Sequence, residues 1–183
     1  MLSLNNLVLR PMGENDLEMV LKWRNSPEIR HNMLSNITIA WEEHIEWFKR
    51  NLNTDKSELF VVEYKGRAIG VVNITDISRK DKTCSWGMYI GDDQRNFGLG
   101  ILMNIRAIDR MVNSHGIRKI WGHVLGDNRI LLLHERFGFK QEGVLKSHIE
   151  RNGIFEDVTL VGFFTDKWQE NRKKLIQALR IRE

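Results

Sequence analysis

The chain has 183 residues, of which 42% are hydrophobic, enough to bury the core of one domain. We therefore expect a single domain spanning residues 1–183. The 28 Lys and Arg residues and the 24 Asp and Glu residues give a net charge of +4, spread over both halves, which favours an anionic small partner. The single cysteine, Cys84, excludes an internal disulfide and a metal cluster built on thiolates.

Hydropathy and charge pattern also limit where the chain acts. No apolar run approaches membrane-spanning length, and the start "MLSLNNLVLR" lacks the apolar core of a signal peptide. We therefore expect a cytoplasmic protein without a membrane partner. The basic residues form no dense stripe and no nucleic-acid recognition motif appears, so we expect no nucleic-acid partner.

The N-terminal part of the chain predicts one strand followed by two helices. "LVLRPM", residues 7–12, alternates in the manner of a strand. Asn15 is the expected cap of a first helix, which Pro27 ends. Thr38 is the expected cap of a second helix over residues 41–52, whose apolar residues recur with helical spacing.

The rest of the chain is dominated by predicted strands. β-branched and aromatic residues mark four of them, and the Asn-Gly turn at 152–153 marks a closing hairpin of two more. These six strands cover residues 59–64, 68–75, 83–90, 119–125, 141–149 and 155–164. One helix is expected to end near Gly116 and another, capped by Asp127 or Asn128, at Gly138. The chain is thus a mixed α/β (α+β) protein with about seven strands and about four helices.

The stretch "QRNFGLG", residues 94–100, lies between a predicted strand and a predicted helix. A strand that runs through glycines into a helix presents unpaired amides at the positive end of the helix dipole, and such a place binds phosphate. Gly98 and Gly100 remove Cβ atoms from the approach, and Arg95 adds a fixed charge. The alternative is that the glycines only form a tight turn, and spacing alone does not separate the two interpretations.

The same residues resemble a known family. Arg95-x-x-Gly98-x-Gly100 after a strand resembles the acetyl-coenzyme A pyrophosphate loop of the GCN5-related N-acetyltransferases, and "DNRILLLHERFGFKQEG" resembles a later signature of that family. The resemblance covers nearly the whole chain and implies a splayed, mostly antiparallel mixed sheet. It implies acetyl-coenzyme A as co-substrate, no metal, and a pantetheine arm held between the fourth and fifth strands. The cofactor-binding residues that it implies are Met88, Tyr89, Ile90, Arg95, Asn96, Phe97, Gly98, Leu99, Gly100 and Asn128.

A finer resemblance concerns the acceptor. "LKWRNSPEIRHNM", "EEHIEWF" and "WGMYI" resemble the branch that acetylates the 4-amino group of a UDP-linked dideoxy-altrosamine sugar during pseudaminic acid synthesis. That branch implies a nucleotide-sugar substrate, and a homodimer is compatible with it. Similar Trp-Arg-Asn segments occur in protein N-terminal acetyltransferases, so a protein N-terminus or a polyamine remains the alternative acceptor.

Acetyl transfer to an amine needs a route for the amine proton, oxyanion donors and an acid for the leaving thiolate. Many family members have a glutamate base where this chain has Ser85 and a tyrosine acid where it has His134. An imidazole titrates near neutrality and can protonate the thiolate, although a packed core histidine is the alternative for His134. Tyr89 shares one strand face with Ser85 and is a second candidate acid. For Ser85, ordinary strand alternation is the alternative.

Five further residues are candidates for substrate binding. Arg24 and Arg30 can bind a diphosphate through bidentate contacts, or they are surface charges near a helix end. Glu43 and His44 can reach a substrate, although acids at a helix start most often complement the dipole. Asn73 can hold a water near the amine or serve as a structural amide.

Overall fold

One seven-stranded sheet organises the molecule, in the order β1-β2-β3-β4-β5-β7-β6. The computed structural model describes residues 2–93, 98–126 and 130–183. The strands are β1 (Leu7–Pro11), β2 (Glu58–Tyr64), β3 (Arg67–Ser78), β4 (Thr83–Ile90), β5 (Lys119–Leu125), β6 (Lys140–Arg151) and β7 (Ile154–Phe164). All neighbouring strands are antiparallel except β4 and β5.

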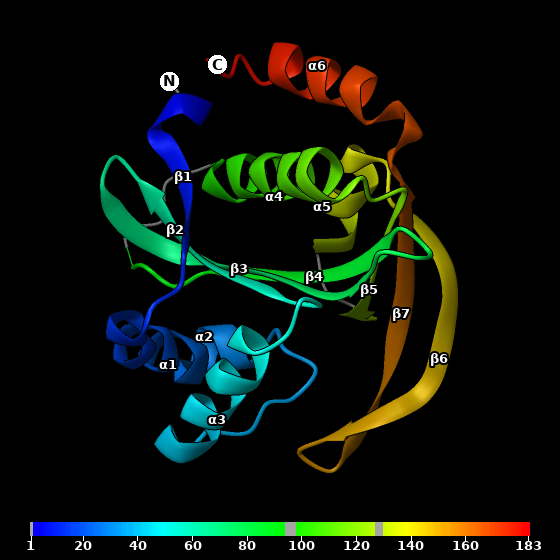
Figure 1. Cartoon of the computed structure of the whole chain (residues 1–183). Helices are drawn as coiled ribbons and strands as arrows, with labels where there is room; N and C mark the ends of the chain where they lie inside the picture. Colours follow the sequence, from blue (N-terminus) through cyan, green and yellow to red (C-terminus); the bar gives the residue numbers. More distant parts are fainter. Residues whose placement is uncertain (1, 94–97, 127–129) are drawn as a thin grey trace.

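Helices cover both faces of this sheet. Figure 1 shows α1, α2 and α3 on one face and α4, α5 and α6 on the other. The helices are α1 (Leu17–Asn25), α2 (Pro27–Arg30), α3 (Trp41–Leu52), α4 (Leu99–His115), α5 (Ile130–Phe137) and α6 (Trp168–Ala178). Over the described ranges, no helix has both the length and the apolar character needed to cross a membrane.

Strand alternation sends side chains into two separate cores. On the α4 side, Val72 and Cys84 pack with α4 residues such as Ile105, and all three are fully buried. On the α1 side, Val71 packs with Val20 and the α3 residue Phe48. Each such side chain contributes about 1.5–3 kcal/mol by leaving water. Neighbouring residues on one strand therefore fix both helical layers to the sheet.

The structure confirms the predicted order of strands and the four predicted helices, which are α1, α3, α4 and α5. The caps predicted at Asn15 and Thr38 are wrong, and the cap predicted at Asp127 or Asn128 lies outside the described residues. Asn15 lies inside a short 3-10 turn, and the carboxylate of Asp16 accepts the hydrogen bond of the Gly13 amide at 2.8 Å. Thr38 does not cap α3, because Glu43 accepts the amide of the cap residue, Ala40, at 3.0 Å. In both turns the observed cap residue, Gly13 or Ala40, donates its own amide to a carboxylate three residues later.

Two helices were not predicted. Pro27 begins α2, where its missing N–H costs nothing, in addition to limiting the preceding helix. The C-terminal helix α6 is mostly polar and anchors through the fully buried Trp168, whose indole N–H donates to Asp109 at 2.8 Å. The structure therefore has six α-helices in its described ranges rather than about four.

Candidate active site

The sheet opens between its two parallel strands. β4 and β5 pair at only three positions, ending with Ser85 opposite Trp121. Beyond this point β4 continues beside β3 alone, and β5 beside β7 alone, among the described strands. The large ring of Trp86 lies at the opening, where a Cβ on Gly122 would stand 3.0 Å from it. Beyond Ser85, the edge of β4 that faces β5 therefore has no partner among the described strands.

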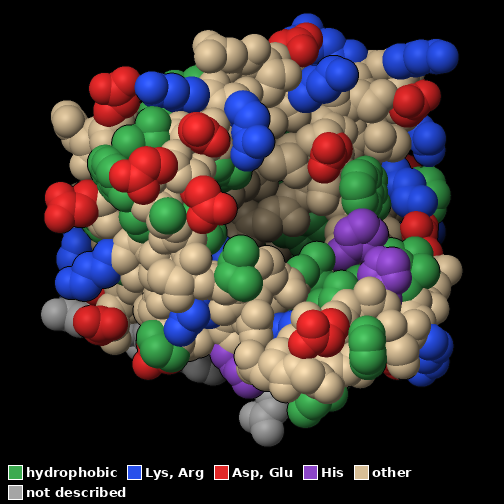
Figure 2. All heavy atoms as spheres, turned by 90° about the horizontal axis from the view of Figure 1, so that it is seen from below, with side chains coloured by type: hydrophobic (Ala, Val, Ile, Leu, Met, Phe, Trp, Pro, Cys, Tyr) green, Lys and Arg blue, Asp and Glu red, His purple; other side chains and the backbone are tan. Residues whose placement is uncertain are grey.

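A cavity of about 860 Å³ fills this opening. Figure 2 views the face that carries α1–α3 and shows the hollow near its centre. Of the sequence-predicted residues, the lining includes Arg24, Glu43, His44, Asn73, Met88, Tyr89, Ile90, Gly100 and His134. The volume is that of a typical small-molecule site. Residues far apart in the sequence are thus brought together in one cavity.

Other predicted residues stand elsewhere. Four of them lie outside the lining: Arg30, Ser85, Gly98 and Leu99. Another four fall outside the described residues: Arg95, Asn96, Phe97 and Asn128. Within the described ranges, no cluster of three or more His, Cys, Asp or Glu side chains is arranged to hold a metal ion.

The start of α4 borders the cavity at Gly100. Gly98 is the cap residue and has φ +92°, a left-handed conformation that favours glycine. The next two amides, of Leu99 and Gly100, have no carbonyl partner within the helix. The Leu99 side chain is fully buried, so it fixes the helix start and offers only its backbone to a ligand. Amides at the positive end of a 17-residue helix suit a pyrophosphate.

His134 lies on α5 and also lines the cavity. Its ring centroid is 5.1 Å from that of Trp86 and 5.3 Å from that of Phe139. Its Nδ1 is buried and has no hydrogen-bond partner among the described residues. Burial lowers the pKa of His134 to about 4, so the imidazole is neutral at pH 7. The sequence-based expectation that this imidazole titrates near neutrality therefore does not hold at this position.

The other face of β4 turns toward α1. Tyr89 belongs to the apolar cluster on that face, whereas Trp86 and Met88 pack on the α4 side. Burial raises the pKa of Tyr89, partly opposed by Arg24, so the phenol remains a proton donor. Asn73 lies opposite Gly87 in the β3–β4 ladder, and its Oδ1 is buried without a described partner. Ser85 is the last residue of β4 that pairs with β5, and it is not part of the cavity lining.

Arg24 brings a positive charge to the α1 side of the cavity. Its Nη2 donates to the Ser35 carbonyl at 3.0 Å, whereas its Nη1 is buried with no partner among the described residues. Burial lowers the pKa of Arg24; the nearby Tyr89 opposes this shift and the nearby Arg30 adds to it. The neighbouring Asn25 exchanges two hydrogen bonds of 2.9 Å with the Ile39 backbone. The Trp-Arg-Asn segment thus brings the positive charge of Arg24 to the cavity and holds the facing loop through hydrogen bonds of Arg24 and Asn25.

Arg30 also holds that loop. Its Nη1 donates to Thr38 Oγ1 at 2.8 Å and to the Asn36 carbonyl at 3.3 Å. These contacts give Arg30 a structural place beside the cavity instead of a position in its lining.

One face of α3 completes the wall. His44 is 3% exposed, and its ring stacks on Trp47 at a centroid distance of 5.3 Å. Burial lowers the pKa of His44, partly opposed by a hydrogen bond with the Leu17 backbone. Trp47 and Arg50 also line the cavity and were not predicted. Their spacing from Glu43, four and seven residues along the helix, is the signal that would have identified them.

Comparison with known proteins agrees with this geometry. The acetyltransferase (GNAT) domain family matches residues 6–140. Acetyltransferase PseH from Campylobacter jejuni is 28% identical over 129 residues, which cover 70% of this chain and 78% of the relative. Spermidine N(1)-acetyltransferase from Vibrio cholerae is 24% identical over 166 residues, which cover 90% of this chain and 96% of the relative.

A solved structure shares this fold. The crystal structure of spermidine N-acetyltransferase from Vibrio cholerae in complex with CoA and spermine has a TM-score of 0.83 at 23% identity, covering 90% of this chain and 99% of the other. The unpaired edge of β4 and the amides at the start of α4 fit a pantetheine arm and a pyrophosphate. The chain therefore belongs to the GNAT acetyltransferase family and is an acetyl-coenzyme A-dependent N-acetyltransferase.

Proposed function

We propose that the acceptor is the 4-amino group of a UDP-linked amino-dideoxy sugar, as in pseudaminic acid biosynthesis. The observation that carries this proposal is Arg24, a guanidinium at the cavity whose Nη1 is buried without a described partner. A buried charged donor without a partner is costly, and a diphosphate would satisfy it. Arg50 adds a second cation to the lining. The 28% identity to acetyltransferase PseH supports the same branch.

A polyamine is the second candidate, favoured by the similarity to spermidine acetyltransferases. Polyamines are polycations and need carboxylates around them. The acids in the described lining are Glu28 and Glu43, and Glu43 already accepts the Ala40 amide. The two lining arginines oppose a polycation, so the charge balance favours an anionic acceptor.

In the proposed reaction the acceptor amine, after its ammonium form has lost one proton, attacks the thioester carbonyl carbon. The new N–C bond forms, the nitrogen gives up a second proton, and the C–S bond breaks, so that the sulfur leaves as a thiolate that takes up a proton. We assign the acid role to Tyr89, whose hydroxyl keeps its proton, whereas the neutral imidazole of His134 is assigned the relay of the amine proton between its two ring nitrogens. Asn73, His44 and Glu43 are proposed to orient the sugar and its amine, while Met88, Tyr89 and Ile90 offer strand backbone to the pantetheine arm. Ser85 has no role in this scheme because it lies outside the lining.

A panel of acceptors tests the proposal. The UDP-amino-sugar, the free amino-sugar, spermidine and a ribosomal-protein N-terminal peptide are compared in one thiol-release assay. We expect the highest kcat/KM for the UDP-amino-sugar and a lower kcat for the free sugar, because remote diphosphate contacts help to orient the amine. Preferential acetylation of spermidine or of the peptide would reject this acceptor and leave the family and cofactor assignments unchanged.

A further inference from the structure

One wall of the cavity is an irregular segment, residues 31–39, which we call the wall segment. Six of its residues line the cavity: Asn32, Met33, Leu34, Ser35, Ile37 and Ile39. In the described part of the chain, residues 34–38 make no backbone–backbone hydrogen bond. Side chains hold this segment instead, including Arg24, Asn25 and Arg30 from the two preceding helices. Its shape therefore depends on contacts that lie outside the segment.

The β6–β7 hairpin supplies a further contact from 120 residues away in sequence. Figure 1 shows this hairpin reaching past the sheet to the level of α1–α3. Arg151, at the end of β6, donates through Nη2 to the His31 carbonyl at 2.7 Å. Beside it, Asn36 Nδ2 donates to Asn152 Oδ1 at 3.1 Å. These two hydrogen bonds, here called the hairpin contact, join the first residue and the middle of the wall segment to the tip of one hairpin.

Arg151 is unusual because it is buried near the end of a hairpin. It is 6% exposed, and its Nη1 donates to both carboxylate oxygens of Glu156, at 3.2 and 3.0 Å. A buried ion pair adds little net stability, because desolvation offsets the attraction. The planar guanidinium, however, fixes two partners at once in one geometry. Glu156 therefore orients Arg151, and Arg151 orients the His31 carbonyl.

We propose that Arg151 is a positioning residue for the acceptor, acting through the wall segment rather than by touching substrate. This rests on the proposed function only in assigning the α1–α3 side of the cavity to the acceptor. Arg151 and its partner His31 are both absent from the lining, whereas the residues that directly follow His31, from Asn32 to Ser35, line the cavity. Loss of its contact with His31 should loosen the acceptor wall and leave the cofactor end, at the start of α4, unchanged.

The test uses R151K, which keeps the charge beside Glu156 but loses the fork that also reaches His31. The matched control is K146M, which removes the exposed Lys146–Asp157 ion pair of the same hairpin. Steady-state kinetics are measured with whichever acceptor the parent protein acetylates, together with hydrogen exchange over residues 31–39. For R151K we expect about a tenfold rise in acceptor KM, an unchanged KM for acetyl-coenzyme A, and faster exchange in the wall segment. K146M should match the parent in all three measurements.

An unchanged acceptor KM in folded R151K, or an equal rise in both KM values, would overturn the proposal. If R151K does not fold, N36A removes the second hydrogen bond of the hairpin contact and should raise acceptor KM about threefold; an unchanged KM would again overturn it. The two proposals fail separately. Were spermidine the acceptor, the nucleotide-sugar proposal would be wrong, while the Arg151 comparison would proceed with spermidine.

Discussion

His134 and Tyr89 pack on opposite faces of β4, so the part that each plays in proton transfer can be tested by a separate mutation. If His134 handles a proton in the chemical step, His134→Ala should lower kcat roughly a hundredfold with nearly intact coenzyme A binding. Because burial lowers its pKa to about 4, His134 should add no inflection to the kcat/KM profile near pH 6.5. Tyr89→Phe keeps the ring and removes only the hydroxyl. A lower Tm with unchanged kcat would identify His134 as a packing residue.

A mutation of Arg24 tests whether this residue binds the diphosphate of an anionic acceptor. Replacing it with Met removes the buried guanidinium and keeps much of the apolar stem. We expect Arg24→Met to lower kcat/KM for the UDP-amino-sugar by roughly tenfold to a hundredfold, with a much smaller effect on the free amino-sugar. Lys22→Met, an exposed change on the same helix, is the control. Equal losses for both sugars would show that Arg24 does not contact the diphosphate.

At the scale of elements, mutations at the two glycines of the junction before α4 can distinguish an effect on folding from an effect on cofactor binding. A Cβ at Gly98 would overlap the Leu2 side chain and stand at φ +92°, so Gly98→Ala should lower both Tm and coenzyme A affinity. A Cβ at Gly100 would meet only Ile90 Cδ1, at 3.9 Å, an ordinary contact. Gly100→Ala should therefore keep its Tm and weaken coenzyme A binding about tenfold, measured by calorimetry. Unchanged affinity in a folded Gly100→Ala protein would contradict the phosphate-loop assignment.

The helices and strands also show which features of the fold can be predicted from the sequence. Strands and long helices were predicted because their apolar periodicity follows directly from burial. Helix α6 was missed because its sequence is mostly polar and it is held by tertiary contacts, among them those of Trp168 and Arg172 with Asp109. Both cap errors arose because the segments are capped at other residues, Gly13 and Ala40, whose amides donate to carboxylates three residues later. Arg24 was found through its segment resemblance, whereas Arg151 was not, because its partner His31 lies 120 residues away.

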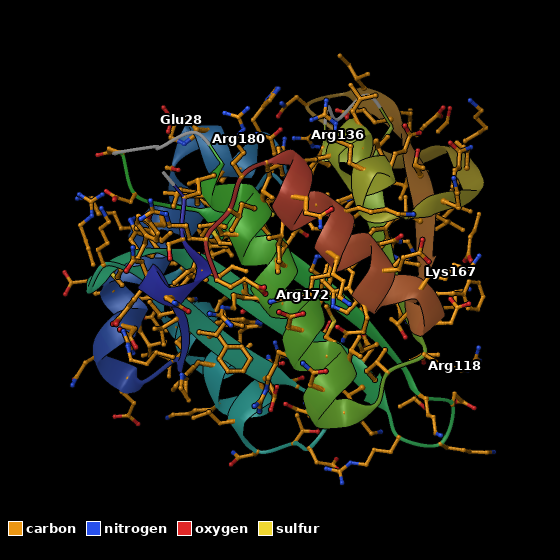
Figure 3. The ribbon with its side chains drawn as sticks, turned by 90° about the horizontal axis from the view of Figure 1, so that it is seen from above. Glu28, Arg118, Arg136, Lys167, Arg172 and Arg180 are labelled. Atoms are coloured by element: carbon orange, nitrogen blue, oxygen red, sulfur yellow. The ribbon has the colours of Figure 1, made fainter. Side chains whose placement is uncertain are left out.

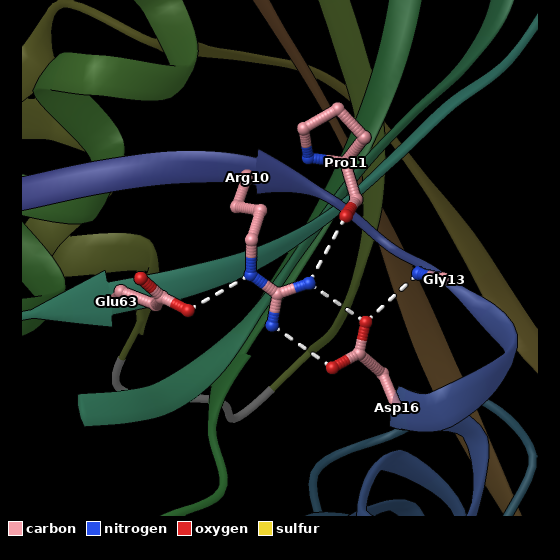
Figure 4. Close-up of polar contacts among 5 residues, drawn as sticks. All are labelled: Arg10, Pro11, Gly13, Asp16 and Glu63. Carbon is pink, nitrogen blue, oxygen red and sulfur yellow. Dashed lines mark hydrogen bonds and ion pairs between the residues drawn. The ribbon is translucent and has the colours of Figure 1, made fainter. Parts of the chain in front are cut away.

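At the scale of the whole molecule, arginines tie both helical layers to neighbouring elements. Figure 3 shows α6 lying across α4, with Arg172 between them. Arg172 Nε bonds both oxygens of Asp109 at 3.0 Å, so α6 is held to α4 by the same carboxylate that accepts from Trp168. On the other layer, Arg10 of β1 bonds Glu63 of β2 and the turn before α1 (Figure 4). Each layer is thus joined to the rest of the fold through a carboxylate that must stay ionised.

This dependence predicts loss of stability in acid. Arg10 donates to both oxygens of Asp16, at 2.8 and 2.9 Å, and these hydrogen bonds lower the pKa of Asp16 despite its burial. Because the folded pKa lies below the unfolded value of about 3.9, this stabilisation is present above about pH 4 and is lost as the pH falls through the folded pKa. Asp16→Asn should lower the free energy of unfolding at pH 7 by about 1 kcal/mol, or roughly 2–4 °C in Tm, since the partly exposed Arg10 is screened by water.

The deficit of Asp16→Asn should shrink as the pH is lowered below 4, because the parent then loses the same charge. Thermal unfolding of both proteins between pH 7 and pH 3 measures this difference. Glu14→Gln removes an exposed carboxylate from the same turn and serves as the control for net charge. A deficit that stays constant with pH would mean that Asp16 stabilises the turn through its hydrogen-bond geometry and not through its ionisation.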